Sequence, residues 1–176
     1  METQPNFKGV LYVIACGSSS APLTYNLVLE AQRQGWDVCV LTTPNGRKFL
    51  NIPQLAEVTG HPVRSEYKQP DEPDLLPPAD AIIVFPATFN TINKWALGIA
   101  DTLPLGLLAE YTGLHKPVVA VPCFRTGGGL DTNRAFARSV RMLRRHGIRV
   151  IYEPETYPPK NQVPPQVILA ELEKLL

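Results

Sequence analysis

An apolar run at residues 81–85, Ala-Ile-Ile-Val-Phe, constrains the fold more than any other stretch of the chain. Because every residue in it is apolar, the run is typical of a strand buried on both faces of a parallel sheet. Pro86 has no amide hydrogen, so we expect it to end the hydrogen bonding of this strand. The polar stretch 86–94 follows, with candidate helix caps at Thr88, Asn90 and Thr91. A polar loop therefore follows a buried strand, at the edge where ligands bind in open α/β sheets.

Other short apolar runs alternate with segments of helical spacing. Strands are expected at residues 10–15, 38–41, 63–66, 81–85, 117–121 and 148–152. Helices are expected at residues 22–34, 45–50, 53–58, 92–99, 104–111, 131–146 and 166–176. This alternation predicts an α/β fold, a three-layer sandwich in which helices cover both faces of a central parallel sheet.

The length of 176 residues predicts a single domain, residues 1–176, with the proline-rich loop and final helix of residues 154–176 packed on it. A net charge of +1 gives no reason to expect a nucleic acid or an anionic membrane as partner. No apolar run approaches the roughly 18 residues that a membrane span needs. The three cysteines fall in or after predicted strands, which indicates core thiols in the reducing cytoplasm.

Polar residues follow the first two predicted strands. After the first strand come Gly17, Ser18 and Ser19, where glycine allows close backbone approach and hydroxyls can bind a phosphate. An ordinary helix cap is the alternative for this turn. Thr42 and Arg47 after the second strand either extend a phosphate site or form a polar turn. The glycines of a dinucleotide fingerprint and the lysine of a Walker loop are missing, which disfavours both ligand classes.

The third strand end offers Asn90, whose side-chain amide both donates and accepts hydrogen bonds. It can contact the edge of a heterocycle or a carboxylate, or it can cap the helix. His61, His115 and His146 are scattered, and no two of them have the spacing of metal ligands. We therefore expect no metal site.

Residues 86–91 read Pro-Ala-Thr-Phe-Asn-Thr, and residues 98–103 read Gly-Ile-Ala-Asp-Thr-Leu. These stretches resemble the motifs Pro-Ala-Ser-Ala-Asn-Thr and Gly-Ile/Leu-Cys-Asp-Asn-Leu of the homo-oligomeric flavin-containing cysteine decarboxylases. That family includes phosphopantothenoylcysteine decarboxylase and the lantibiotic peptide decarboxylases. The resemblance implies a flavodoxin-like fold, bound FMN at a subunit interface, and a trimer or an assembly of trimers.

The resemblance also implies site residues. Those assigned to the cofactor are Gly17, Ser18, Ser19, Thr42, Phe49, Pro86, Ala87, Thr88, Asn90, Cys123 and Arg125. In the decarboxylases the motif asparagine, here Asn90, holds the substrate carboxylate. The flavin there oxidises a cysteine thiol to a thioaldehyde, after which carbon dioxide leaves, and the protein supplies orientation and charge.

The chain departs from the family motifs at three places. The family's active-site histidine is absent, and an ungapped alignment puts Glu72 there, a residue that can act as acid or base if its pKa is tuned. Arg125 replaces an asparagine, where it can bind an anionic substrate or the flavin, or pair with an acid at an interface. Phe89 stands where the motif has alanine.

These features leave three hypotheses. The first is an FMN-binding redox enzyme that acts on a small or peptidyl substrate. The second is an oxidative decarboxylase of a peptidyl or pantothenoyl cysteine that uses Glu72 in place of histidine. The third is a non-catalytic FMN-binding or regulatory subunit.

Overall fold

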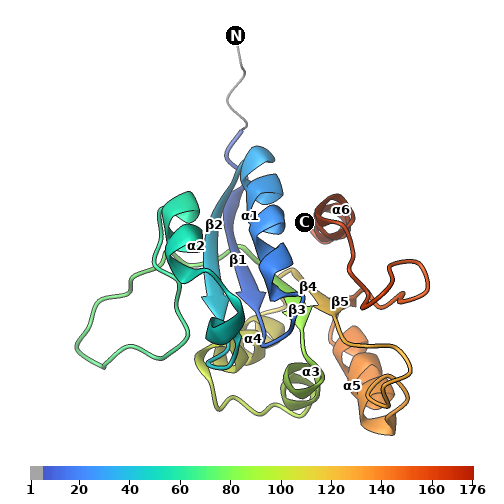
Figure 1. The fold of residues 1–176 in the computed structure, drawn as a ribbon. Coiled ribbons are helices and arrows are strands. Elements are labelled where there is room, and N and C mark those ends of the chain that lie inside the picture. Colours follow the sequence, from blue (N-terminus) through green and yellow to red (C-terminus); the bar gives the residue numbers. More distant parts are fainter. Residues whose placement is uncertain (1–5) are drawn as a thin grey trace.

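A computed structural model describes residues 6–176. Its centre is a five-stranded sheet in which every pairing is parallel and the strand order is β2-β1-β3-β4-β5 (Figure 1). The strands are β1 (Gly9–Ala15), β2 (Trp36–Thr42), β3 (Ala81–Ala87), β4 (Val118–Pro122) and β5 (Arg149–Val150). This order is that of flavodoxin-like sheets, so the predicted fold class is confirmed.

Helices cover both faces of the sheet. In chain order they are η1 (Ala21–Leu23), α1 (Thr24–Arg33), η2 (Gly46–Phe49), α2 (Ile52–Thr59), α3 (Phe89–Ala96), α4 (Leu103–Gly113), α5 (Arg134–Arg145) and α6 (Pro165–Glu173). Apolar residues of α1, α2 and α6 pack on one face, and those of α3, α4 and α5 pack on the other. The result is a three-layer sandwich.

Strand β1 shows why a continuous apolar run is required. All seven of its residues are buried. Leu11 and Val13 belong to the cluster with α1 and α6, whereas Tyr12 and Ile14 belong to the cluster with α3, α4 and α5. Because successive side chains point to opposite faces, a strand covered on both sides needs apolar residues throughout.

Two of the predicted strands are wrong: one is absent, and the other is shorter than predicted. Residues 63–66 form no strand, because only an isolated bridge joins Arg64 to Leu41 at the edge of the sheet. Polar residues fill most of this stretch, so it lacks the apolar surface that holds the other strands. The strand predicted at 148–152 is reduced to the two residues of β5.

Strand β3 does not end at Pro86, as the sequence had predicted. It continues to Ala87, and the Pro86 carbonyl accepts a hydrogen bond from the Cys16 amide at 3.0 Å. The pairing with β4 shifts register between Val84 and Ala87. Proline is tolerated because its carbonyl still pairs and the shifted ladder does not require its missing donor.

The C-terminal helix α6 packs against α1 and β4. It follows a connection that starts after β5 and passes the carboxyl end of β4, where Asn161 donates a hydrogen bond to the Pro122 carbonyl at 2.8 Å. No helix in residues 6–176 is both long enough and apolar enough to cross a membrane.

Candidate functional site

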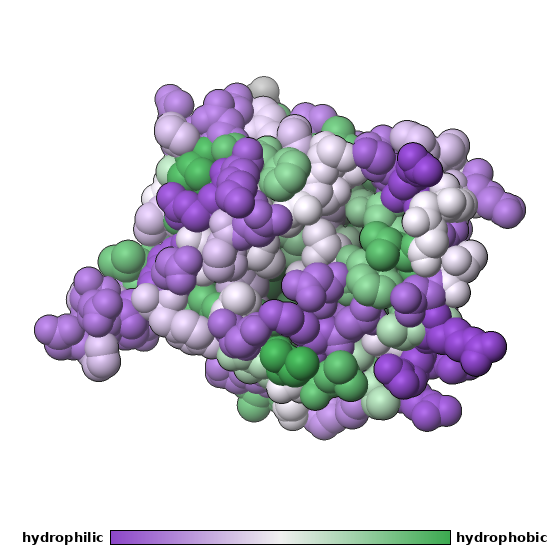
Figure 2. Space-filling model, turned by 60° about the horizontal axis from the view of Figure 1, so that its bottom comes forward, coloured by the Kyte–Doolittle hydropathy of each residue, from purple (hydrophilic) through white to green (hydrophobic). Residues whose placement is uncertain are grey.

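A cavity of about 700 Å³ opens at the carboxyl edge of the sheet. Loops that follow β1, β2, β3 and β4 line it. Figure 2 views this side of the molecule and shows weakly polar and hydrophobic residues recessed between hydrophilic ones. The chain leaves β1 and β3 in opposite directions across the sheet, and ligands bind at such switch points in open α/β folds. The volume lies within the range of small-molecule and cofactor sites.

Residues 17–20, which we call the serine turn, form one wall of this cavity. The Ser18 amide donates to the Cys16 carbonyl at 2.9 Å, and the Ser20 amide donates to Ser18 Oγ at 3.1 Å. Within the described chain, the amide hydrogens of Gly17 and Ser19 have no acceptor. Free amide donors beside hydroxyl groups suit an anionic group such as a phosphate.

The loop after β3 forms a second wall. Thr88 is the N-cap of α3, and its Oγ1 accepts a hydrogen bond from the Thr91 amide at 3.3 Å. The side chain of Asn90 is exposed and has no hydrogen-bond partner among residues 6–176. Thr88 is therefore the cap, and the Asn90 amide is available to a ligand.

The loop after β4 contributes an aromatic wall. Phe124 lies against Phe136, with ring centroids 4.9 Å apart at an interplanar angle of 81°, and against Phe89 at 6.4 Å. Tyr152 closes the same cluster, 5.6 Å from Phe124. Edge-to-face packing holds these rings in place. Phe89 and Phe124 thereby give the cavity a firm apolar side that suits a planar aromatic ligand.

Charge in the cavity comes from basic side chains. Lys94 is paired with Asp101 at 2.7 Å, whereas Arg125 and Lys160 have no carboxylate within 4.0 Å in the described part of the chain. Among residues 6–176, no Asp, Glu or His lines the cavity. The site is therefore built to receive an anion and lacks an obvious general base.

The thiols near the site are protonated at neutral pH. Burial is the main cause that raises the pKa of both Cys16 and Cys123. Of the two, Cys123 lines the cavity. A thiol with a raised pKa is a poor nucleophile because the thiolate is the reactive form. Cys123 thus acts as a small wall residue.

Seven of the predicted site residues line this one cavity: Gly17, Ser18, Ser19, Thr88, Asn90, Cys123 and Arg125. Pro86 and Ala87 are buried in β3 and do not line the cavity. Phe49 instead lines a separate pocket of about 210 Å³ with Tyr25 and Leu50. The flavin contacts assigned to these residues stay predictions.

Thr42 is fully buried, and its hydroxyl donates to the Ala15 carbonyl at 2.8 Å. This hydrogen bond joins the ends of β1 and β2. Gly46 lies so close to Thr42 that a Cβ on the glycine would be 2.2 Å from Thr42 Oγ1, so residue 46 has no room for a side chain. The next residue, Thr43, lines the cavity in its place.

Glu72 does not line the cavity. It belongs to the long connection from α2 to β3, the green loop that extends away from the body of the molecule in Figure 1. Its carboxylate accepts a hydrogen bond from the Gln69 amide at 2.8 Å. Within one chain, therefore, Glu72, the predicted acid or base, does not share the cavity with Asn90, which is predicted to hold the substrate carboxylate.

Sequence reasoning missed Lys160, which lines the cavity. Lys160 follows two prolines in a loop without any motif, and its hydroxyl partner Ser19 is 141 residues away in the chain. No local pattern could have joined them.

The model of the family described as Flavoprotein matches residues 2–169 of this chain. The coenzyme A biosynthesis bifunctional protein CoaBC of Thermococcus kodakarensis is 31% identical over 115 residues, covering 62% of this chain and 28% of that protein. The CoaBC protein of Methanocaldococcus jannaschii is 32% identical over 112 residues, with coverage of 62% and 28%. The chain spans less than a third of the length of these relatives.

Solved structures agree with the fold. The cypemycin decarboxylase CypD superposes with a TM-score of 0.76 at 24% identity, covering 98% of this chain and 97% of that one. The FMN binding protein AtHal3 gives 0.75 at 20% identity, with coverage of 95% and 97%. The epidermin biosynthesis protein EpiD from Staphylococcus aureus gives 0.70 at 26% identity, with coverage of 92% and 98%.

Proposed function

Because this chain belongs to the Flavoprotein family, we propose that it binds FMN in the cavity at the carboxyl edge of the sheet and acts as a flavin-dependent enzyme. The observation that carries this proposal is the convergence of the serine turn, Thr88, Asn90 and an aromatic wall on one cavity of about 700 Å³. FMN-dependent decarboxylases and an FMN binding protein are among the structures that share this fold.

The residues present fit a flavin mononucleotide. The free amide hydrogens of Gly17 and Ser19 and the hydroxyls of Ser18 and Ser19 suit its phosphate. The apolar side formed by Phe89 and Phe124 suits its ring system. These features lie at different walls of the same cavity, as a ligand with an anionic end and an aromatic end requires.

The favoured reaction is oxidative decarboxylation of a substrate that ends in cysteine. When bound, the flavin would be the oxidant and would accept two electrons and two protons from the thiol-bearing carbon and its sulfur. Asn90 donates from its side-chain amide to the substrate carboxylate and orients it. Arg125, at the cavity rim, adds a positive charge that draws an anionic substrate into place. The peptidyl-cysteine decarboxylase EpiD and the FMN-dependent cysteine decarboxylase TvaF share this fold, which supports a cysteine substrate.

A second candidate function is flavin binding without catalysis. It is favoured by a specific observation: no Asp, Glu or His of residues 6–176 lines the cavity. The cavity therefore lacks the three side-chain types that most often act as general acid or base. The hypothesis that Glu72 replaces the family histidine would require it to reach a cavity that it does not line within one chain.

We further propose a homo-oligomer, a trimer or an assembly of trimers, located in the cytoplasm. Leu97 is 64% exposed and Ile99 is 39% exposed, both directly after α3 and close in sequence to the cavity residues. Exposed apolar side chains of this kind suit a subunit contact. Light scattering of purified protein at several concentrations measures the assembly.

The experiment adds FMN to purified protein and follows flavin fluorescence. Peptides ending in cysteine, and matched peptides ending in serine, are then incubated with the loaded protein and analysed by mass spectrometry. Loss of carbon dioxide and two hydrogens from the cysteine peptide alone is the expected result. Flavin binding without any mass change favours the second candidate, and failure to bind FMN contradicts both.

A further inference from the structure

The loop between β5 and α6 reaches back to the serine turn. Lys160 donates from Nζ to Ser19 Oγ at 2.5 Å, and Gln162 donates from Nε2 to Ser20 Oγ at 3.3 Å. Lys160 also lines the cavity. Two side chains of this loop therefore donate hydrogen bonds to the serine turn, which carries the free amides.

Asn161, between these two residues, anchors the loop. It is fully buried, and its Nδ2 donates to the carbonyls of Pro122 and Ile151, both at 2.8 Å. Its Oδ1 accepts from the Glu153 amide at 2.9 Å. It has a φ of 57°, in the left-handed region that asparagine tolerates better than most residues. The anchor fixes the loop to the end of β4 and so fixes where Lys160 can reach.

Lys160 is the basic residue best placed for an anion at the serine turn. It is half-buried and has no carboxylate within 4.0 Å among residues 6–176, whereas Lys94 is occupied by Asp101. Arg125 stands on the loop after β4 and has no hydrogen bond to the serine turn in the described chain, whereas Lys160 donates one to Ser19. Its charge is therefore uncompensated beside the unpaired amides of Gly17 and Ser19.

We propose that Lys160 binds the phosphate of the flavin and makes the protein select FMN over riboflavin; this inference rests on the proposed function. A phosphate monoester carries about −1.5 to −2 charges at pH 7. The ammonium group has three donors, so it can keep Ser19 and also donate to a phosphate oxygen. Riboflavin lacks the phosphate and gains nothing from this lysine.

The test compares the wild-type protein with Lys160→Gln, which keeps a polar hydrogen-bond donor on a side chain one bond shorter but removes the charge. Titrations with FMN and with riboflavin give four dissociation constants. We expect FMN binding to weaken about tenfold or more, because a charge-assisted hydrogen bond is lost. We expect riboflavin binding to change by less than about twofold. Lys160→Arg, which keeps the charge, should recover most of the FMN affinity.

Lys116→Gln is the matched control. It is an exposed lysine without a carboxylate within 4.0 Å in the described residues, and it precedes β4 at the opposite edge of the sheet. It should leave both affinities unchanged. Circular dichroism and thermal unfolding of each variant show that the fold is kept.

The outcomes separate the two proposals. If wild-type protein binds neither flavin, the proposed function fails and takes this inference with it. If it binds FMN and Lys160→Gln binds FMN equally well, only the role of Lys160 is overturned. Equal weakening of FMN and riboflavin also overturns it, because the lysine would then support the cavity rather than the phosphate.

Discussion

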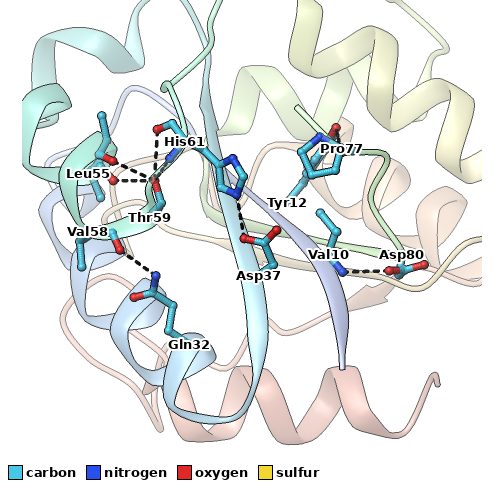
Figure 3. Close-up of polar contacts among 11 residues, drawn as sticks. Val10, Tyr12, Gln32, Asp37, Leu55, Val58, Thr59, His61, Pro77 and Asp80 are labelled. Atoms are coloured by element: carbon cyan, nitrogen blue, oxygen red, sulfur yellow. Dashed lines mark hydrogen bonds and ion pairs between the residues drawn. The ribbon is translucent and has the colours of Figure 1, made fainter. Parts of the chain in front are cut away.

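The two edges of the sheet carry similar polar residues but use them differently. At the amino edge the polar side chains are paired: Asp80 accepts from the Val10 amide at 2.8 Å, the Tyr12 hydroxyl donates to the Pro77 carbonyl at 2.7 Å, and His61 meets Asp37 at 2.7 Å (Figure 3). At the carboxyl edge the side chains of Asn90 and Arg125 have no partner of this kind in residues 6–176 and face a cavity.

This contrast shows that a polar residue is a binding candidate only when the fold leaves its hydrogen-bonding groups free. Asp37 and His61 have the chemistry of an active site, but each satisfies the other far from the cavity. Asn90 is an ordinary residue type that becomes useful because Thr88 has taken the helix cap. Substitutions at paired groups should therefore lower the free energy of unfolding more than substitutions at free groups.

The largest effect is expected for Asn161→Ala, because this residue is a fully paired polar group at the carboxyl edge. Its loss leaves the Pro122 and Ile151 carbonyls and the Glu153 amide without partners. We expect a loss of about 3 kcal/mol in the free energy of unfolding, measured by urea denaturation. A loss below about 0.5 kcal/mol would show that pairing does not set stability at this edge.

Tyr111→Phe should have the next largest effect, at the amino edge. The Tyr111 hydroxyl accepts from the Ala79 amide at 3.0 Å and donates to the Ala79 carbonyl at 3.1 Å. Removing it leaves both groups unpaired in a buried region, at a cost of about 2 kcal/mol. Flavin affinity, titrated on folded protein, should not change. A large change in flavin affinity would show that a paired group at the amino edge also affects ligand binding, which contradicts the proposed difference between the two edges.

The free energy of unfolding at alkaline pH tests a buried thiol in the core, between the two edges. Burial raises the pKa of the Cys39 thiol from 9.0 to about 12. Below pH 9 this thiol is protonated in both states, so its contribution to stability is fully present. As pH rises above 9 only the unfolded chain ionises it, and the free energy of unfolding falls by about 1.4 kcal/mol per pH unit from this group. Denaturation between pH 8 and pH 11 measures the slope, which should be shallower for Cys39→Ala; an identical slope would refute the assignment.

The smallest effect on stability is expected for Asn90→Ala, and it should have the clearest effect on function. The side chain is exposed and without a partner in the described chain, so we expect a change of less than about 0.5 kcal/mol. Turnover of a cysteine peptide, or FMN affinity if Asn90 serves only the cofactor, should fall about tenfold or more. Asn26→Ala, an exposed asparagine on α1, is the control. Wild-type behaviour of Asn90→Ala in both assays removes it from the site.

Much of the fold could be predicted from the apolar runs. Strands covered on both faces need apolar residues at every position, so β1 and β3 stand out in the sequence. The stretch at 63–66 failed as a strand because a single bridge at a sheet edge leaves no comparable pattern. The extension of β3 through Pro86 was also missed, since only the register shift against β4 makes room for a proline.

The parallel sheet, the polar strand ends and the Pro-Ala-Thr-Phe-Asn-Thr loop can be predicted from the chain alone, because they are local patterns of burial and turn chemistry. Which of the polar groups are free depends on how distant segments pack. In the structure the Thr42 hydroxyl donates to the Ala15 carbonyl, and Glu72 lies outside the cavity. Lys160 donates a hydrogen bond to Ser19, which is 141 residues away in the chain. Such outcomes depend on which segments the packed helices bring together, and no spacing along the chain encodes that.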